Sequence, residues 1–118
     1  MPVPPGLEEG IRRFDAEEWF EAHEAWEDHW GFGSPEERDA TLGLIKAAVA
    51  LHHLAARNEA GFAWQAKEAI PRLRAGAPLW PEIDLAGVAD ALESLVAQAR
   101  YHGRLPKDWA APRLRRPA

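Results

Sequence analysis

The stretch TLGLIKAAVALHHLAA, residues 41–56, is apolar over almost its whole circumference when it is placed on a helical wheel. A helix with one apolar stripe lies at a surface, whereas a helix that is apolar nearly all round must be covered by several neighbours. Strand-like alternation is absent, and Gly and Pro fall between segments of 3.6-residue periodicity. We therefore expect an all-α bundle with a buried central helix.

The periodicity predicts a single-domain bundle of about four helices. They are expected at roughly residues 15–30, 35–57, 59–74 and 85–101. The chain is divided accordingly into an N-terminal extension (1–14), a helical bundle domain (15–103) and a basic, proline-rich C-terminal tail (104–118). A chain of 118 residues can bury about two thirds of its unfolded surface without a metal or a disulfide.

Capping residues mark the expected helix starts. Asp15 has Glu18 three residues later, which is the spacing of a capping box, and Ser34 precedes a proline that suits the first helical position. Asp84 is the expected N-cap of the last helix. Pro71 should kink or begin to end the third helix, because it lacks a backbone N–H.

Composition excludes several classes of site. The chain has no cysteine, so disulfides, zinc–thiolate fingers and cysteine nucleophiles are ruled out. No segment approaches the roughly 18 apolar residues of a membrane span, and the N-terminus lacks the pattern of a signal peptide. A cytoplasmic protein without membrane contact is expected.

The charge is unevenly distributed along the chain. The net charge is −5, yet the tail from Arg104 onwards holds five basic residues and only one acid, Asp108. An acidic body disfavours binding to nucleic acid, and the tail offers at most a weak contact with nucleic acid or an acidic partner. The simpler interpretation is a solubilising end that packs through one anchor, Trp109.

The first predicted helix carries two polar residues within its apolar face. His23 and Glu27 project into the middle of that face at about 100° per residue. The apolar members of the same face are Ala16, Trp19, Phe20, Trp26 and Trp30. An unpaired buried carboxylate is costly, so Glu27 must be paired, protonated or open to a cavity. The four-residue spacing makes a contact between the His23 imidazole and the Glu27 carboxylate sterically available.

Further polar partners lie on the second predicted helix. His52 shares a side with apolar residues, and His53 lies nearer a polar stripe. Gly43, with Ala47 and Ala50, makes another side small enough for a neighbouring helix to approach closely. If the first two helices pair antiparallel, His23 and Glu27 should face residues 40–46. A site that joins them to His52 would then need a third element or a second subunit.

The motifs FEAHEAWEDHW, GLIKAAVALHHL and a following Asn-x-x-Gly turn resemble the bacterial and archaeal family called domain of unknown function 309. The resemblance extends over roughly residues 11–105 and implies a small all-helical protein without an established activity. Lys46 departs from the family's usual glutamine. The family's motif positions fall on Phe20, Glu21, His23, Glu24, Glu27, Trp30, Gly43, His52 or His53, Asn58 and Gly61.

Three interpretations of the His/Glu cluster remain open. In the first, His23, Glu24 and Glu27 form a structural network with Asn58, tryptophan N–H groups or backbone. In the second, these residues line a ligand or partner pocket that also includes Trp26, Trp30, His52 and His53. The third is a metal-assisted hydrolytic site.

The hydrolytic site would use a divalent metal ion as its cofactor. Its ligands would come from His23, Glu24, Glu27 and His52, with a bound water as the nucleophile. However, HEAWE is not the two-histidine HExxH signature. We therefore expect a binding or interaction protein with a polar pocket between the first two helices, and a metal-dependent hydrolase is the alternative. Six tryptophans in a short chain also suggest a homodimer.

Overall fold

The helix at the centre of the predicted bundle forms as expected and has neighbours on opposite sides. The computed structural model describes residues 1–115, and its elements in chain order are the 3-10 helix η1 (Pro5–Leu7), α1 (Glu8–Asp15), α2 (Trp19–His29), α3 (Pro35–Ala55), α4 (Glu59–Gly76) and α5 (Leu85–His102). No strand occurs in these residues, which confirms the all-α class. The expected number of four helices was wrong, because the region before residue 30 forms two α-helices.

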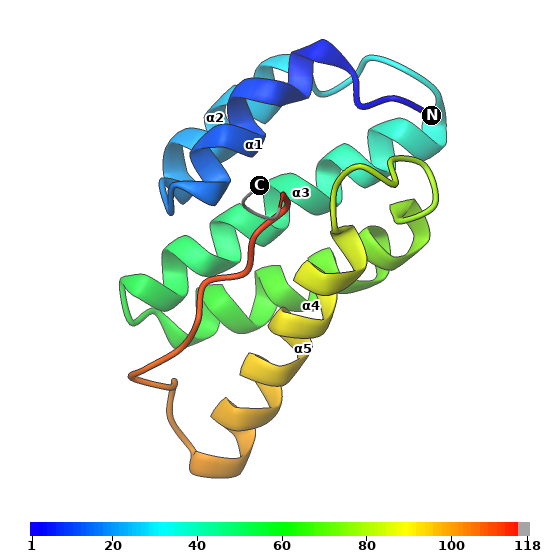
Figure 1. Cartoon of the computed structure of the whole chain (residues 1–118). Coiled ribbons are helices and arrows are strands. Elements are labelled where there is room, and N and C mark those ends of the chain that lie inside the picture. The colour runs from blue at the N-terminus through cyan, green and yellow to red at the C-terminus, as the bar shows by residue number, and fades with distance from the viewer. Residues whose placement is uncertain (116–118) are drawn as a thin grey trace.

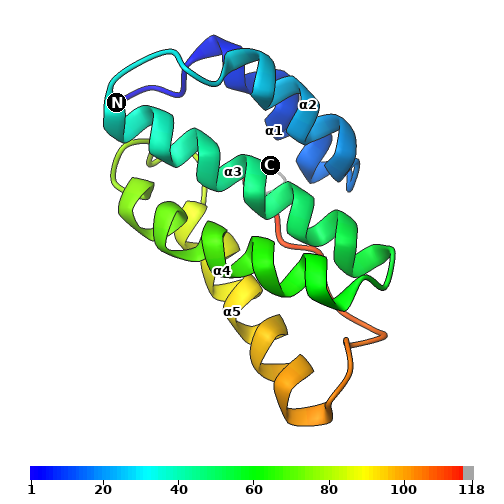
Figure 2. The same cartoon turned by 180° about the vertical axis from the view of Figure 1, so that it is seen from behind.

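Each helix packs mainly against the next one along the chain. The α1–α2 pair covers one side of α3, and α4 lies along the other side with α5 beyond it (Figures 1 and 2). Within residues 1–115, no helix is both long and apolar enough to cross a membrane. The buried core includes residues of every α-helix, with α3 in the middle.

Local sequence signals explain α3. The Ser34 hydroxyl accepts a hydrogen bond from the backbone N–H of Glu37, and the Glu37 carboxylate accepts one from the N–H of Ser34, each at 3.1 Å. This is a complete capping box. A Cβ at Gly43 would lie only 2.8 Å from the Cβ of Arg72 on α4. The expected close approach of a neighbouring helix at Gly43 is therefore confirmed.

The predicted bounds of the last two helices hold to within two residues. Asn58 and Asp84 cap α4 and α5 by accepting from backbone N–H groups three residues later, each at 2.9 Å. Pro71 lies inside α4, which continues to Gly76 instead of ending at residue 74. The expectation that Pro71 would begin to end this helix was therefore wrong; the proline is exposed on the surface of α4.

The segment expected to be an N-terminal extension contains α1 and part of the core. Leu7, Ile11 and Phe14 recur at helical spacing and are almost completely buried. The indole N–H of Trp26 donates to the carbonyl of Leu7 at 3.1 Å. A Cβ at Gly10 would overlap this indole, so glycine allows α1 and α2 to approach closely.

The expected helix 15–30 is interrupted at its start. Asp15 is the last residue of α1, and Glu17 reverses the chain with a φ of 62°. α2 begins at Trp19 after Glu18, whose side chain makes no capping hydrogen bond. The expected capping box of Asp15 and Glu18 was therefore wrong, and Ala16, expected on the core face, is exposed.

Asp15 instead binds the far end of the chain. Its two carboxylate oxygens accept from the backbone N–H groups of Leu114 and Arg115, at 2.7 and 3.0 Å. The Arg115 guanidinium forms a two-bond pair with Glu8, and this hydrogen bonding holds the pKa of the Glu8 carboxyl below its usual range. We call these contacts between α1 and the tail the tail clasp.

The tail is also held along its length as it returns from α5 towards α1 (Figure 1). The ring of Trp109 lies 5.4 Å from that of Trp19. Arg57 donates to the carbonyls of Leu105 and Pro106, at 2.9 and 2.6 Å. Trp109 thus packs as an anchor among several; residues 116–118 of the expected tail lie outside the described residues.

Asp15→Ala removes the acceptor of two backbone hydrogen bonds. We expect it to lower the free energy of unfolding by about 1.5–3 kcal/mol, because bonds to a charged acceptor are stronger than neutral ones. Urea denaturation measures this loss. Asp108→Ala alters an exposed acid of the same tail and should stay within about 0.5 kcal/mol of the wild type. Equal losses in both variants would contradict the tail clasp.

Candidate functional site

The core-facing side of α2 differs from the side that the sequence predicted. Trp19, Ala22 and Trp26, at helical spacing, are the buried residues of this helix. Burial of Trp26 against α1 rotates α2 so that Glu27 faces solvent, with 57% of its side chain exposed. The expectation that Glu27 lies on the buried face was therefore wrong. His23 is intermediate, with 15% of its side chain exposed.

An outward stripe of mixed chemistry results from this rotation. Phe20, His23, Glu27 and Trp30 follow one another at spacings of three, four and three residues, which places them on one side of α2. We call these four residues the α2 stripe. Phe20 and Trp30 are 48% and 51% exposed, so two aromatic rings flank a histidine and a carboxylate at the surface.

His23 is oriented by two acceptors on its own helix. Its Nδ1 lies 2.5 Å from the carbonyl oxygen of Phe20, which can only accept, so Nδ1 carries the proton. Its Nε2 lies 3.4 Å from a carboxylate oxygen of Glu27. In the neutral ring Nε2 then presents a lone pair, and in the protonated ring it donates to Glu27. The pair can accept or donate a proton towards a bound group.

Phe20 also connects the α2 stripe to α3. Its ring centroid lies 4.8 Å from that of His23 and 5.5 Å from that of His52. The start of α2 is thus placed against the end of α3, and His52 approaches the stripe without a third element. The sequence analysis expected His52 to reach His23 and Glu27 only through a third element or a second subunit, and the register on which this expectation rested was wrong.

Other predicted site residues have structural roles. Trp26 is fully buried and bonded to Leu7, so it lines no pocket. His53 packs over Gly61, and its ring centroid lies 6.0 Å from that of His52. Asn58 caps α4. These contacts place His53 and the Asn-x-x-Gly turn of the sequence motif in the α3–α4 connection, whereas His52 is exposed beside Phe20.

The expected metal site is not assembled. Within residues 1–115, no group of three or more His, Asp or Glu side chains is arranged to hold a metal ion. Glu24 is exposed and lies one residue, about 100°, around α2 from His23. His52 contacts the ring of Phe20, at 5.5 Å between ring centroids, and joins no such group within the described residues. The predicted ligands His23, Glu24, Glu27 and His52 therefore do not converge.

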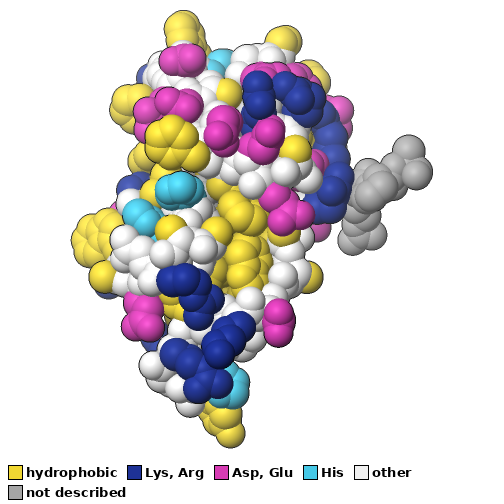
Figure 3. Space-filling model, turned by 90° about the vertical axis from the view of Figure 1, so that its left-hand side faces the viewer, with side chains coloured by type: hydrophobic (Ala, Val, Ile, Leu, Met, Phe, Trp, Pro, Cys, Tyr) yellow, Lys and Arg dark blue, Asp and Glu magenta, His cyan; other side chains and the backbone are white. Residues whose placement is uncertain are grey.

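The surface carries a mixture of charged and apolar groups. Figure 3 shows one face on which histidine side chains lie beside exposed hydrophobic groups, with basic side chains below them and both acidic and basic side chains above. On the tail, Arg113 donates to the carbonyl of Asp15 at 3.1 Å, and Arg115 pairs with Glu8. Both contacts occupy basic groups that the sequence offered to an acidic partner.

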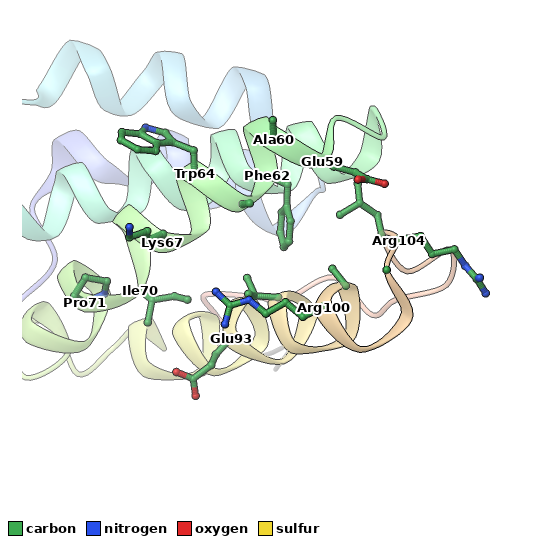
Figure 4. A pocket seen from close by; sticks show the side chains of 15 residues that line it. Glu59, Ala60, Phe62, Trp64, Lys67, Ile70, Pro71, Glu93, Arg100 and Arg104 are labelled. Carbon is green, nitrogen blue, oxygen red and sulfur yellow. The ribbon is translucent and has the colours of Figure 1, made fainter.

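A groove between α4 and α5 was missed by the sequence analysis. It has a volume of 790 Å³. Phe62, Ile70 and Val96 contribute apolar surface to it, and Lys67 and Arg100 contribute charge (Figure 4). The sequence feature that could have indicated this groove is the helical spacing of Trp64, Lys67 and Pro71, which places them on one side of α4. Trp64 is 60% exposed on this side.

The exposure of the His23–Glu27 pair predicts small effects on stability. Glu27→Gln should lower the free energy of unfolding by less than about 1 kcal/mol, because exposed ion pairs contribute little. His23→Ala should cost about 1 kcal/mol, since it also removes the bond to Phe20. Glu24→Gln, at an exposed acid on the same helix, is the control. A loss above about 2 kcal/mol for Glu27→Gln would indicate a buried network instead.

Comparison with known proteins agrees with the resemblance of the motifs. No curated protein and no solved structure matches the chain. The sequence model of one family matches residues 7–65, which is half of the chain and includes α1, α2, α3 and the beginning of α4. The match does not extend to residue 105, where the resemblance was expected to end. The chain belongs to the family described as a domain of unknown function (DUF309).

Proposed function

We propose that this protein is a small helical interaction protein that binds another protein through the α2 stripe. The observation that carries the proposal is the pair of half-exposed aromatic rings, Phe20 and Trp30, on either side of the His23–Glu27 pair. Aromatic residues are enriched at the centres of protein interfaces, where they supply much of the binding free energy.

The stripe is suited to a protein surface and offers no enclosed site. Three clefts in the described part of the chain, of 790, 530 and 300 Å³, all lie elsewhere. Small-molecule sites are usually concave, whereas protein interfaces can be nearly flat. We therefore propose an exposed binding surface in place of the polar pocket that was expected between the first two helices.

Charge indicates the kind of partner. Glu21, Glu24 and Asp28 are exposed on α2 beside the stripe. A partner with basic side chains around an apolar patch would complement them. A second copy docking through the same face would bring like charges together, which is unfavourable. We therefore favour a basic protein partner over a homodimer.

Photocrosslinking in the cells that make the protein tests this proposal. Phe20 is replaced by the photoreactive analogue benzoylphenylalanine, and we expect a discrete protein adduct after irradiation. The adduct should weaken at least about tenfold when Trp30→Ala is added, because tryptophans at interface centres contribute 2 kcal/mol or more. Immunoblotting of irradiated cells measures both.

The same analogue at Ala86, an exposed residue of α5, is the control. Equal adducts at both positions, or no adduct at Phe20, would contradict the proposal. Light scattering of the purified chain separates the partners. A mass above the 13.1 kDa monomer that returns to it in the Trp30→Ala variant would identify a second copy as the partner instead.

The metal-dependent hydrolase is the second candidate function, and one observation favours it. Nε2 of His23 and the carboxylate of Glu27 lie on the same side of α2, 3.4 Å apart, and could share an ion. Two protein ligands are fewer than the three that catalytic zinc sites use. A metal site would therefore need a ligand from a partner or a rearrangement of His52.

We expect little metal affinity in the isolated chain. Elemental analysis of protein purified without a metal column should give less than about a tenth of an equivalent of any transition metal, because two ligands hold zinc weakly. Added manganese, nickel or zinc should leave the melting temperature unchanged. A stoichiometric metal, or a shift that His23→Ala abolishes, would support the hydrolase instead.

A further inference from the structure

The groove between α4 and α5 has the form of a seat for another helix. Along α4 the lining residues include Ala60, Ala63, Lys67 and Pro71, and along α5 they include Val96 and Arg100. These positions recur every three or four residues. They therefore form two ridges, one on each helix, with a channel between them. A third helix packs into this kind of channel in helical bundles.

The length of the groove fits about three helical turns. Its lining runs from Glu59 to Pro71 on α4 and from Glu93 to Gly103 on α5. At 1.5 Å per residue these stretches are about 15–18 Å long. A partner helix of about 11–13 residues would fill them. The lining is mainly apolar, so a partner must present an apolar stripe at the matching spacing.

The rim of the groove is positive in a chain whose net charge is −5. Lys67, Arg100 and Arg104 lie on the rim, and within residues 1–115 they form no ion pair. The Glu93 carboxylate is already paired with Arg74 of α4, 3.4 Å away, so it is not a free acid of the rim. The other rim acid, Glu59, lies at one end.

We propose that the α4–α5 groove binds an acidic amphipathic helix of a partner protein. The apolar stripe of that helix would cover Ala63, Ile70 and Val96, above the buried ring of Phe62. Its acidic flanks would pair with Lys67 and Arg100. This site is distinct from the α2 stripe, and most of its lining lies beyond residue 65, where the family match ends.

Other occupants fit the groove less well. The chain's own tail is held elsewhere, by Arg57 at one end and by the tail clasp on Asp15 at the other. A basic helix would be repelled by the positive rim. A nucleic acid would leave the apolar lining without an apolar partner. A second copy of the chain could occupy the groove only through an acidic helix face, and the light scattering described below distinguishes that case.

Two designed peptides probe the groove of the full chain. Both contain about 18 residues, enough for a helix on binding, and share a stripe of leucines at helical spacing. One carries glutamates on its flanks and the other carries lysines. Fluorescence anisotropy with labelled peptides measures their dissociation constants. We expect the acidic peptide to bind at least about tenfold tighter than the basic one, with salt weakening its binding.

Matched variants locate the binding. Ala63→Glu places a charged side chain in the groove at an exposed helical position and should weaken the acidic peptide at least about tenfold. Ala97→Glu, at an exposed position of α5 outside the lining, should change it less than about twofold. Lys67→Glu with Arg100→Glu should reverse the preference towards the basic peptide. Arg38→Glu, an exposed arginine of α3, should not.

Several outcomes would overturn the proposal. They are no binding of the acidic peptide at up to millimolar concentration, equal binding of both peptides, or binding that Ala63→Glu leaves unchanged. Light scattering that shows a dimer in the wild type and a monomer in Ala63→Glu would assign the groove to a second copy. Circular dichroism and thermal melting confirm that each variant is folded before its binding is interpreted.

Discussion

The position of one indole ring determines what the molecule presents to its surroundings. Trp26 is buried against Gly10 and donates to the Leu7 carbonyl, and these contacts fix the rotation of α2 about its own axis. Ala22, four residues before Trp26, is buried with it, and Glu27, the next residue, faces solvent. Phe20 and Trp30 are left half-exposed with Glu27, and His23 is partly buried between them, so the packing of Trp26 creates the exposed face.

The parts of the fold that the sequence could predict depend on contacts close along the chain. Ser34, Asn58 and Asp84 each bind a backbone N–H three residues away, so their helices could be located from local pattern alone. Asp15 carried a similar signal, but its partners are 99 and 100 residues away. A hydrogen bond of that range leaves no local pattern, and the start of α2 was misplaced for this reason.

The site was only partly predictable for a related reason. A helical wheel shows which residues share a side of α2, and the association of His23 with Glu27 held. It does not show which side the neighbours will cover. Trp19, Trp26 and Trp30 share one broad face of the helix, and only the packing of α1 decides that Trp26 is buried while Trp30 is left exposed. The α4–α5 groove could not be inferred either, because it depends on the angle at which two helices meet.

Two exposed surfaces of opposite character follow from this packing. The α2 stripe combines aromatic rings with acids, and the α4–α5 groove combines apolar side chains with bases. The first lies within the part of the chain that matches the family and the second lies mostly outside it. A chain of this size could thereby hold two different partners at once, one on each side of the α3–α4 layer.

The tail clasp also has a consequence for the order of folding during synthesis. Domains tend to fold from the N-terminus as the chain emerges, and α1 to α4 can begin to pack early. Asp15, however, has no partner in the tail until Leu114 and Arg115, 99 and 100 residues later, have left the ribosome. α1 is therefore fastened only after α2 to α5 have been made, and a nascent chain that stops short of these residues would leave α1 loosely attached.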